Sequence, residues 1–286
     1  MQPGKYYMKT FRGAILACCL TIAGISFFAE MKGKDPIVSG IHTLSIHVRD
    51  TISHDSVYQF LVHKLALPIY YTPEVYGFRR YAGIYAGNMV LEPCGPYPDI
   101  DYATDHFRSI FFGLNFEVHE SLSSSEQALN SIGMKIQVNP NSIYVRDSIL
   151  CSQNIFSALY EIRDKEKRDS LRNILHTSSE ANPGIEYIKA IFVRYREEEN
   201  LLRWKEFLHP HEIGNHGVCQ VNDSLQMHFS RGDINEVEGI TFKVKSLEKA
   251  NQYLLRNNLL KVTSGRKTEL DQSQTFGLVM YVTDEE

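Results

Sequence analysis

The chain has 286 residues, 43% hydrophobic and 22% charged, which fits one large or two ordinary globular domains and excludes a disordered chain. Its formal net charge of −4 provides no basic stripe, so nucleic acid is excluded as an expected partner. Tyrosines cluster between Tyr70 and Tyr102, which fits either a tyrosine-rich sheet or a binding cleft walled by aromatic rings.

The N-terminal segment is unlike the rest of the chain. A short basic start, Met8–Arg12, precedes 17 uncharged residues from Gly13 to Ala29. This pattern predicts that residues 1–30 are a secretory signal peptide or an uncleaved membrane anchor. Ser26–Ala29 lacks an A-x-A cleavage pattern, so both alternatives stay open. In either case we expect the globular part to be exported to the periplasmic or extracellular side, or attached to the membrane through its N-terminus.

The first structural unit opens with an alternating strand, Ile41–Asp50, which leads into a helix near residues 53–66. Pro68 ends this helix. Three short strands are expected at residues 69–71, 76–85 and 88–92, separated by glycines.

The second unit begins near Ser109. Ser123 and Glu126 have the spacing of a capping box, which predicts a helix that Gly133 ends. Strands are expected at residues 135–138, 142–146 and 154–162. The charged run 163–172 is typical of a solvated helix, and an Asn-Pro-Gly turn at residues 182–184 separates the two halves of the chain.

The third unit starts near Glu186, has a helix marked by Leu201, Trp204 and Leu208, and has strands at 218–221 and 224–229, one fewer than expected. The fourth has a strand at 239–244, a helix at 247–257 and a last strand at 276–282. Each unit is βαβββ or a shortened version, and a unit this small buries its core poorly alone. We therefore expect an α+β protein of paired modules, in two domains at residues 36–165 and 185–286, the second degenerate.

These residues resemble a known family. The run GIHTLSIHVRD at residues 40–50, the helix ending before Leu67-Pro68, and the strand Met89–Glu92 are similar to the vicinal oxygen chelate superfamily. That superfamily includes glyoxalases, bleomycin-resistance proteins and type I extradiol dioxygenases. The resemblance is best over 38–95, fair over 109–162 and 238–283, and poor over 186–231. It implies two glyoxalase-like domains of paired βαβββ modules, whose curved sheets enclose a cleft.

The resemblance also implies a metal site. Metalloenzymes of the family hold one divalent ion with His or Glu from the first and last strands of each module. Glu92 and Glu161 match the carboxylate positions of the two N-terminal modules, and His42 is the tempting histidine of the first strand. The predicted metal ligands are therefore Glu92, Glu161 and His42, for Zn, Mn, Ni or Fe. His47 is predicted as a catalytic base.

The alternation of the first strand argues against His42. Residues i and i+2 of a strand share a face, and the apolar set that should pack on the helix is Leu44, Ile46 and Val48. His42 lies on that side, whereas Thr43, Ser45 and His47 face the cleft. Thr43 then takes the family's histidine position. A bulge of one residue would exchange the two faces.

The other modules offer few ligands. Gly113, Ile188 and Gly239 occupy the corresponding first-strand positions. Of the last strands of the third and fourth modules, only that of the third offers a ligand, His228. The loop from His209 to His216 is histidine-rich, which fits either a metal site or a polar loop. Beyond the N-terminal segment three cysteines remain, too few and too scattered for a disulfide framework or a zinc motif.

Two functions stay open. One is a metal-dependent lyase, isomerase or dioxygenase that polarises oxygens of a small substrate. The other is a metal-free small-molecule-binding protein of the bleomycin-resistance type without catalysis, which Thr43 and the tyrosine-rich segment favour. Both place a small molecule in the N-terminal cleft. The chain has no phosphate-binding glycine motif and no serine-hydrolase motif, so nothing points to those functions.

Overall fold

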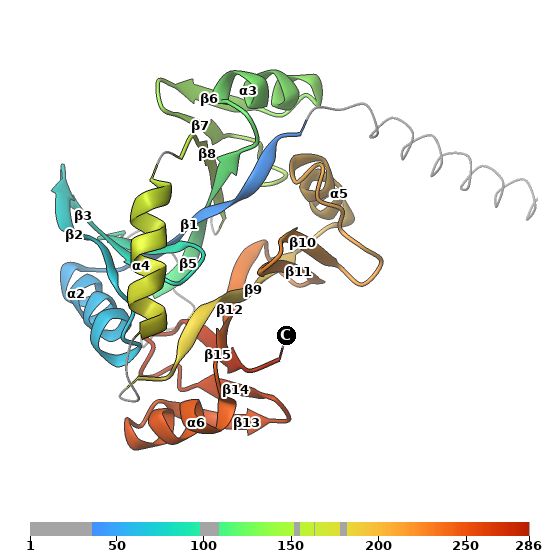
Figure 1. Ribbon diagram of the computed structural model, residues 1–286. Helices are drawn as coiled ribbons and strands as arrows, with labels where there is room; N and C mark the ends of the chain where they lie inside the picture. The colour runs from blue at the N-terminus through green and yellow to red at the C-terminus, as the bar shows by residue number, and fades with distance from the viewer. Residues whose placement is uncertain (1–35, 98–108, 152–154, 163, 178–181, 286) are drawn as a thin grey trace, which may run out of the picture. The chain divides into compact units, whose positions relative to one another are not determined.

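The computed structural model describes residues 36–97, 109–151, 155–162, 164–177 and 182–285 (Figure 1). The predicted signal peptide or anchor at residues 1–30 lies outside these ranges. Residues Pro36–Glu286 form one compact unit. Within the described ranges, no helix has the length and hydropathy needed to cross a membrane.

The first sheet has eight strands in the order β2-β3-β4-β1-β5-β8-β7-β6. Its strands are β1 (Val38–Val48), β2 (Ile69–Tyr76), β3 (Arg79–Tyr85), β4 (Val90–Gly95), β5 (Ser109–Val118), β6 (Ile136–Asn139), β7 (Ser142–Val145) and β8 (Phe156–Tyr160). The helices of this half are α2 (Thr51–Gln59), its π-helical continuation η1 (Phe60–Lys64), and α3 (Leu122–Ser131).

The second sheet has seven strands in the order β10-β11-β9-β12-β15-β14-β13. Its strands are β9 (Ile185–Tyr195), β10 (Val218–Asn222), β11 (Leu225–Arg231), β12 (Glu236–Val244), β13 (Leu260–Ser264), β14 (Lys267–Leu270) and β15 (Val279–Thr283). Its helices are α5 (Glu198–Phe207) and α6 (Leu247–Arg256), and α4 (Lys165–Thr177) connects the two halves.

Both sheets are built by the same rule. In each module the first strand pairs in parallel with the last, as β1 does with β4 and β12 with β15. The first strands of two modules then pair antiparallel, β1 with β5 and β9 with β12. The predicted α+β fold of paired modules is confirmed, including the missing strand of the third module. The proposed domain boundaries remain a prediction.

The helix after β1 forms where the sequence predicts it. Asp50 caps α2 by accepting a hydrogen bond from the Ser53 amide at 2.6 Å. The apolar face of this helix is buried, with Val57, Phe60 and Leu61 each at most 5% exposed.

The capping box predicted for the second helix is wrong in its position. The N-cap of α3 is Ser121, whose hydroxyl accepts from the Ser124 amide at 3.1 Å, while the Ser124 hydroxyl accepts from the Ser121 amide at 3.2 Å. Because β5 ends at Val118, the chain turns into the helix two residues earlier than Ser123 would require. The predicted end of the helix is confirmed, since Gly133 adopts a φ of +66°.

One buried pair joins α5 to the loop after β7. Arg203 donates to Asp147 Oδ2 from Nη2 at 2.6 Å, and also donates to the carbonyl oxygens of Ile132 and Gly133. Burial alone would raise the pKa of Asp147, but hydrogen bonds from Arg203 and the backbone hold it below its usual value. The third module is thus fastened to the second by charge as well as by apolar contact.

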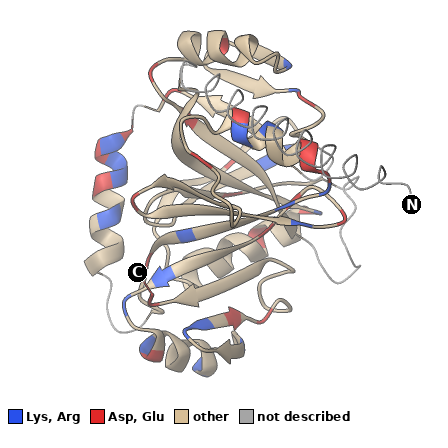
Figure 2. Ribbon diagram, turned by 90° about the vertical axis from the view of Figure 1, so that its right-hand side faces the viewer, with Lys and Arg blue, Asp and Glu red and all other residues tan. Residues whose placement is uncertain are grey.

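The charged run forms helix α4, as predicted, but one side of α4 is buried against the rest of the protein. Leu171 and Leu175 are buried, and Arg168 donates to Glu117 of β5 at 2.5 Å. Over the described ribbon, Lys and Arg are interspersed with Asp and Glu (Figure 2), in keeping with the absence of a basic stripe in the sequence.

Candidate functional site

A cavity of about 470 Å³ lies on the first sheet, between strands of both modules. Its size falls in the range of small-molecule sites, roughly 300–1,000 Å³. Aromatic side chains from several strands wall it: Tyr81, Tyr97, Phe112, Tyr144, Phe156 and Tyr160. The tyrosine-rich segment therefore contributes to a cleft, although Tyr76 is exposed and Tyr85 is buried in the core.

Four rings along one wall are almost parallel. His47 stacks between Tyr97 and Phe112. The ring centroids are 3.7 Å apart with an interplanar angle of 7° for Tyr97, and 3.8 Å apart with an interplanar angle of 19° for Phe112. Phe156 continues the file beyond Phe112 at 6.4 Å and 9°. The Arg79 guanidinium lies over the Tyr97 ring, with its carbon 4.2 Å from the centroid.

His47 lies in the middle of this file and is 7% exposed. Burial, followed by repulsion from Arg79, lowers its pKa to about 3. The imidazole is therefore neutral at ordinary pH, and its Nδ1 is buried with no hydrogen-bond partner. Its predicted role as a catalytic base remains a prediction, and so low a pKa makes it a weak base.

Glu92 lies at the inner end of the cavity with both oxygens engaged. Tyr71 donates its hydroxyl hydrogen to Oε1 at 2.5 Å, and Ser45 donates to Oε2 at 3.2 Å. Burial raises the pKa of Glu92, and the two hydroxyl donors offset this only in part. Ser45 lies opposite Glu92 in the parallel pairing of β1 with β4. Ser45, His47 and Glu92 all line this cavity, whereas Thr43, which was predicted to face the cleft together with Ser45 and His47, does not.

Asn115 extends this polar end from β5. Its amide nitrogen donates to Ser45 Oγ at 3.4 Å, and its Oδ1 is buried without a hydrogen-bond partner. Gly113, two residues earlier, passes so close to Ser45 that a Cβ there would lie 3.0 Å from the Ser45 hydroxyl. The glycine at this predicted ligand position thus permits close packing of the two central strands.

His42 lies at a bulge. The register of β1 against β5 shifts between Ile41 and Thr43, so His42 is the extra residue. Its Nδ1 is 2.6 Å from Thr43 Oγ1 and its Nε2 is 3.8 Å from Asp164 Oδ2. The expectation that His42 shares the apolar face of Leu44 is wrong, because the bulge redirects its side chain.

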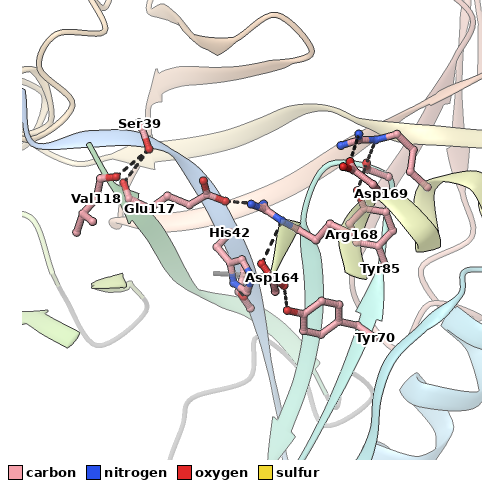
Figure 3. A network of polar contacts seen from close by, with 12 residues as sticks. Ser39, His42, Tyr70, Tyr85, Glu117, Val118, Asp164, Arg168 and Asp169 are labelled. Carbon is pink, nitrogen blue, oxygen red and sulfur yellow. Dashed lines mark hydrogen bonds and ion pairs between the residues drawn. The ribbon is translucent and has the colours of Figure 1, made fainter. Parts of the chain in front are cut away.

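The surroundings of His42 form a polar network at the start of α4. Figure 3 shows Asp164 between His42, Tyr70 and Arg168, and Arg168 reaching on to Glu117. Burial is the largest effect on His42 and lowers its pKa, which Asp164 opposes. His42 does not line the cavity that contains Glu92.

Glu161 lies just past the end of β8 and is exposed. The pairing of β5 with β8 places Ala158 opposite Asn115, as Glu92 lies opposite Ser45. Tyr160 lines the cavity, whereas Glu161 does not. The structure therefore does not bring the predicted ligands Glu92, Glu161 and His42 together.

The donor set of the cavity does not fit a divalent ion. Besides Glu92, it offers the imidazole of His47, which is stacked between Tyr97 and Phe112, and the buried Cys94, whose pKa burial raises well above its usual value, so the thiol keeps its proton. The remaining groups near Glu92 are hydroxyls and an amide, which are weak ligands for Zn, Mn, Ni or Fe. Among the residues that the structure describes, no three His, Cys, Asp or Glu side chains are grouped to hold a metal.

The second sheet presents a different surface at the matching place. Tyr281 lies opposite Thr241 across β12 and β15, as Glu92 lies opposite Ser45. The Lys267 ammonium lies 3.7 Å from the Tyr281 ring centroid and 4.4 Å from that of Phe192. His228 contacts the same Phe192 ring at 5.2 Å. A lysine and aromatic rings thus occupy the place where the first sheet has a carboxyl group.

Several residues of the site were not predicted. Asn115 could have been found from the sequence, because it shares a strand face with Gly113, a position at which a ligand was expected. Arg79, which lines the cavity, and Tyr71, which donates to Glu92, had no such signal. The approach of Arg79 to Tyr97 and of Tyr71 to Glu92 depends on how neighbouring strands are aligned.

Comparison with known proteins gives a structural match only. No family model matches the chain, and no curated protein sequence matches it. Among solved structures, the complex of homoprotocatechuate 2,3-dioxygenase from Brevibacterium fuscum with 3,4-dihydroxyphenylacetate is similar at a TM-score of 0.56 and 13% identity, over 88% of this chain and 82% of that one. A room-temperature structure of an extradiol ring-cleaving dioxygenase from B. fuscum matches at 0.56 and 13%, over 88% and 73%. The chain therefore has the vicinal oxygen chelate fold, and at this identity the likeness concerns the fold alone.

Proposed function

We propose that this chain is a metal-independent small-molecule-binding protein whose ligand occupies the cavity of the first sheet. The observation that carries the proposal is the hydrogen bonding of Glu92. Both of its oxygens accept hydrogen bonds from hydroxyl groups of the protein, Tyr71 and Ser45, inside a cavity walled by rings. The two hydroxyl donors leave lone pairs of Glu92 free, but among the described lining residues no second carboxylate or thiolate stands beside it to complete a metal centre, which favours a binding site.

A metal-dependent dioxygenase is the second candidate, and the fold favours it. The similar solved structures are ring-cleaving dioxygenases, one of them with a bound dihydroxyphenyl compound. For this chain to act in that way, further metal ligands would have to approach Glu92. The buried stack around His47 and the absence of Glu161 from the cavity lining count against that rearrangement.

The proposed location of the protein rests on its N-terminal sequence. Residues 1–30 carry the composition of a signal peptide or an anchor, so we propose export, with or without attachment to the membrane. Cys94, Cys151 and Cys219 are all free thiols.

Metal analysis separates the two candidates. The full chain is incubated with Zn, Mn, Ni or Fe(II), desalted, and analysed by inductively coupled plasma mass spectrometry. The proposal predicts substoichiometric metal for the wild type and no change in Glu92→Gln. One metal per chain that is lost in Glu92→Gln and kept in Glu117→Gln, a carboxylate outside the cavity, would contradict the proposal and favour the metal-dependent candidate.

A further inference from the structure

The charges around the cavity do not balance. Two arginines line it, Arg79 from β3 and Arg146 just after β7. The only carboxyl group among the described lining residues is Glu92, whose pKa burial raises. Two cations against a single carboxyl group leave an excess of positive charge, which attracts negative charge from outside.

Arg79 lines the cavity and has a donor without an acceptor. It is held by its face against the Tyr97 ring at 4.2 Å and by the Phe78 ring at 5.1 Å. Its Nε is buried and has no hydrogen-bond partner, which is costly for a charged donor. A guanidinium presents Nε and a terminal nitrogen as a planar fork that matches the two oxygens of a carboxylate.

Arg146 adds charge at the exposed side of the cavity. Its Nε and Nη2 donate to Gln137 Oε1 at 3.1 and 2.9 Å. Because Gln137 is neutral, this bond fixes the arginine without cancelling its charge. Its guanidinium also lies 5.5 Å from the Tyr144 ring centroid, on the cavity wall.

The aromatic rings of the cavity wall determine which shape of ligand fits. The parallel file of Tyr97, His47, Phe112 and Phe156 gives a wall of uniform tilt, and Tyr144 packs against Phe156 at 5.6 Å. Flat apolar groups fit such a wall with little loss of conformational freedom. At the inner end, the unpartnered Asn115 Oδ1 is ready to accept a hydrogen bond from a ligand hydroxyl or amine.

We infer that the cavity binds planar aromatic acids, with the acid group on the Arg79 fork, Arg146 adding charge at the outer side, and the ring along the aromatic wall. This inference rests on the proposed function, since it names the ligand class of the same cavity. Beyond the proposed function, it states that the ligand is negatively charged and that Arg79 anchors it.

The test compares two ligands of nearly the same shape, one an anion and the other its neutral amide. Binding of 2-naphthoate and of 2-naphthamide to the full chain is measured by isothermal titration calorimetry in the presence of EDTA. We expect 2-naphthoate to bind about tenfold more tightly or better, because a charge-assisted bidentate contact contributes at least that factor. Arg79→Gln should remove this preference, with little change for 2-naphthamide.

Arg80 provides the matched control. It is the next residue on β3, but it donates to Asp55 at 2.7 Å and does not line the cavity, so Arg80→Gln should keep the preference. Equal or tighter binding of 2-naphthamide to the wild type would overturn the inference and leave the proposed function standing. Binding of neither ligand would contradict both. The comparison of the two ligands needs only the wild type, so a folding defect in a variant does not obscure it.

Discussion

Tyr71 reaches Glu92 across an intervening strand, and Gly83 is the residue that lets it pass. Tyr71 lies on β2 and Glu92 on β4, with β3 between them. A Cβ on Gly83 of β3 would lie 2.4 Å from the Tyr71 ring. The hydroxyl thereby comes within 2.5 Å of Glu92 Oε1. A glycine in a strand thus fixes the donor of a carboxyl group at the inner end of the cavity.

Gly83→Ala should displace the Tyr71 ring and deprive Glu92 of this donor. We expect a loss of about 1–3 kcal/mol in the free energy of unfolding, as for overpacking of a tight site. Urea denaturation of a double-mutant cycle checks the cause. In a Tyr71→Ala background the same substitution should cost much less, and an equal cost in both backgrounds would show that the ring is not what the new methyl group meets.

Glu92→Gln should flatten the dependence of stability on pH. Because burial raises the pKa of Glu92 in the folded protein, its stabilising effect is complete below the unfolded value of about 4.5 and is lost as pH rises through the folded pKa. Between the two values the wild type should lose about 1.4 kcal/mol per pH unit relative to the variant. Denaturation at several pH values between 4 and 9 measures this difference. If the stabilities of the wild type and the variant changed in parallel with pH, the raised pKa of the buried Glu92 would be contradicted.

His47→Phe should make the protein more resistant to acid. The pKa of His47 falls from 6.5 to about 3, so its contribution is present above pH 6.5 and lost as pH falls toward 3. At pH 5 the wild type should have lost about 2 kcal/mol relative to pH 7 through this residue, whereas phenylalanine keeps the ring file without titrating. Thermal unfolding at both pH values tests it, with exposed His63→Gln as the control for removal of a histidine. No gain at pH 5 for His47→Phe would contradict the prediction.

Arg203→Met should strongly destabilise the protein by leaving the buried Asp147 without its cation. We expect a loss of about 3 kcal/mol in the free energy of unfolding. Arg196→Met is the control, because Arg196 and Glu197 are 68% and 63% exposed and 3.5 Å apart, which predicts a change of about 0.5 kcal/mol or less. Similar losses in the two variants would mean that the Arg203–Asp147 pair does not fasten α5 to the first sheet.

The fold was largely predictable because each module has a strong local pattern. The alternation of β1 distinguished Ser45 and His47, which line the cavity, from the buried Leu44 and Ile46. Periodicity of two in a strand is a local property, so one chain segment is enough to read it.

The candidate site was less predictable, because it depends on pairing between distant strands. The bulge at His42 and the register that puts Ala158 rather than Glu161 opposite Asn115 arise from the alignment of β1, β5 and β8. A shift of one residue exchanges the faces of a strand, and no local signal in these segments fixes that shift. The same holds for Arg79, whose position over Tyr97 joins two separate strand ends.

The central claim is that the cavity binds its ligand without a metal. The most direct test is the dissociation constant of 2-naphthoate for the full chain, measured by calorimetry with EDTA and again with added Zn, Mn, Ni or Fe(II). The account predicts saturable binding with EDTA and constants that agree to about twofold in all conditions. Binding that appears only with a metal and is abolished in Glu92→Gln would contradict it.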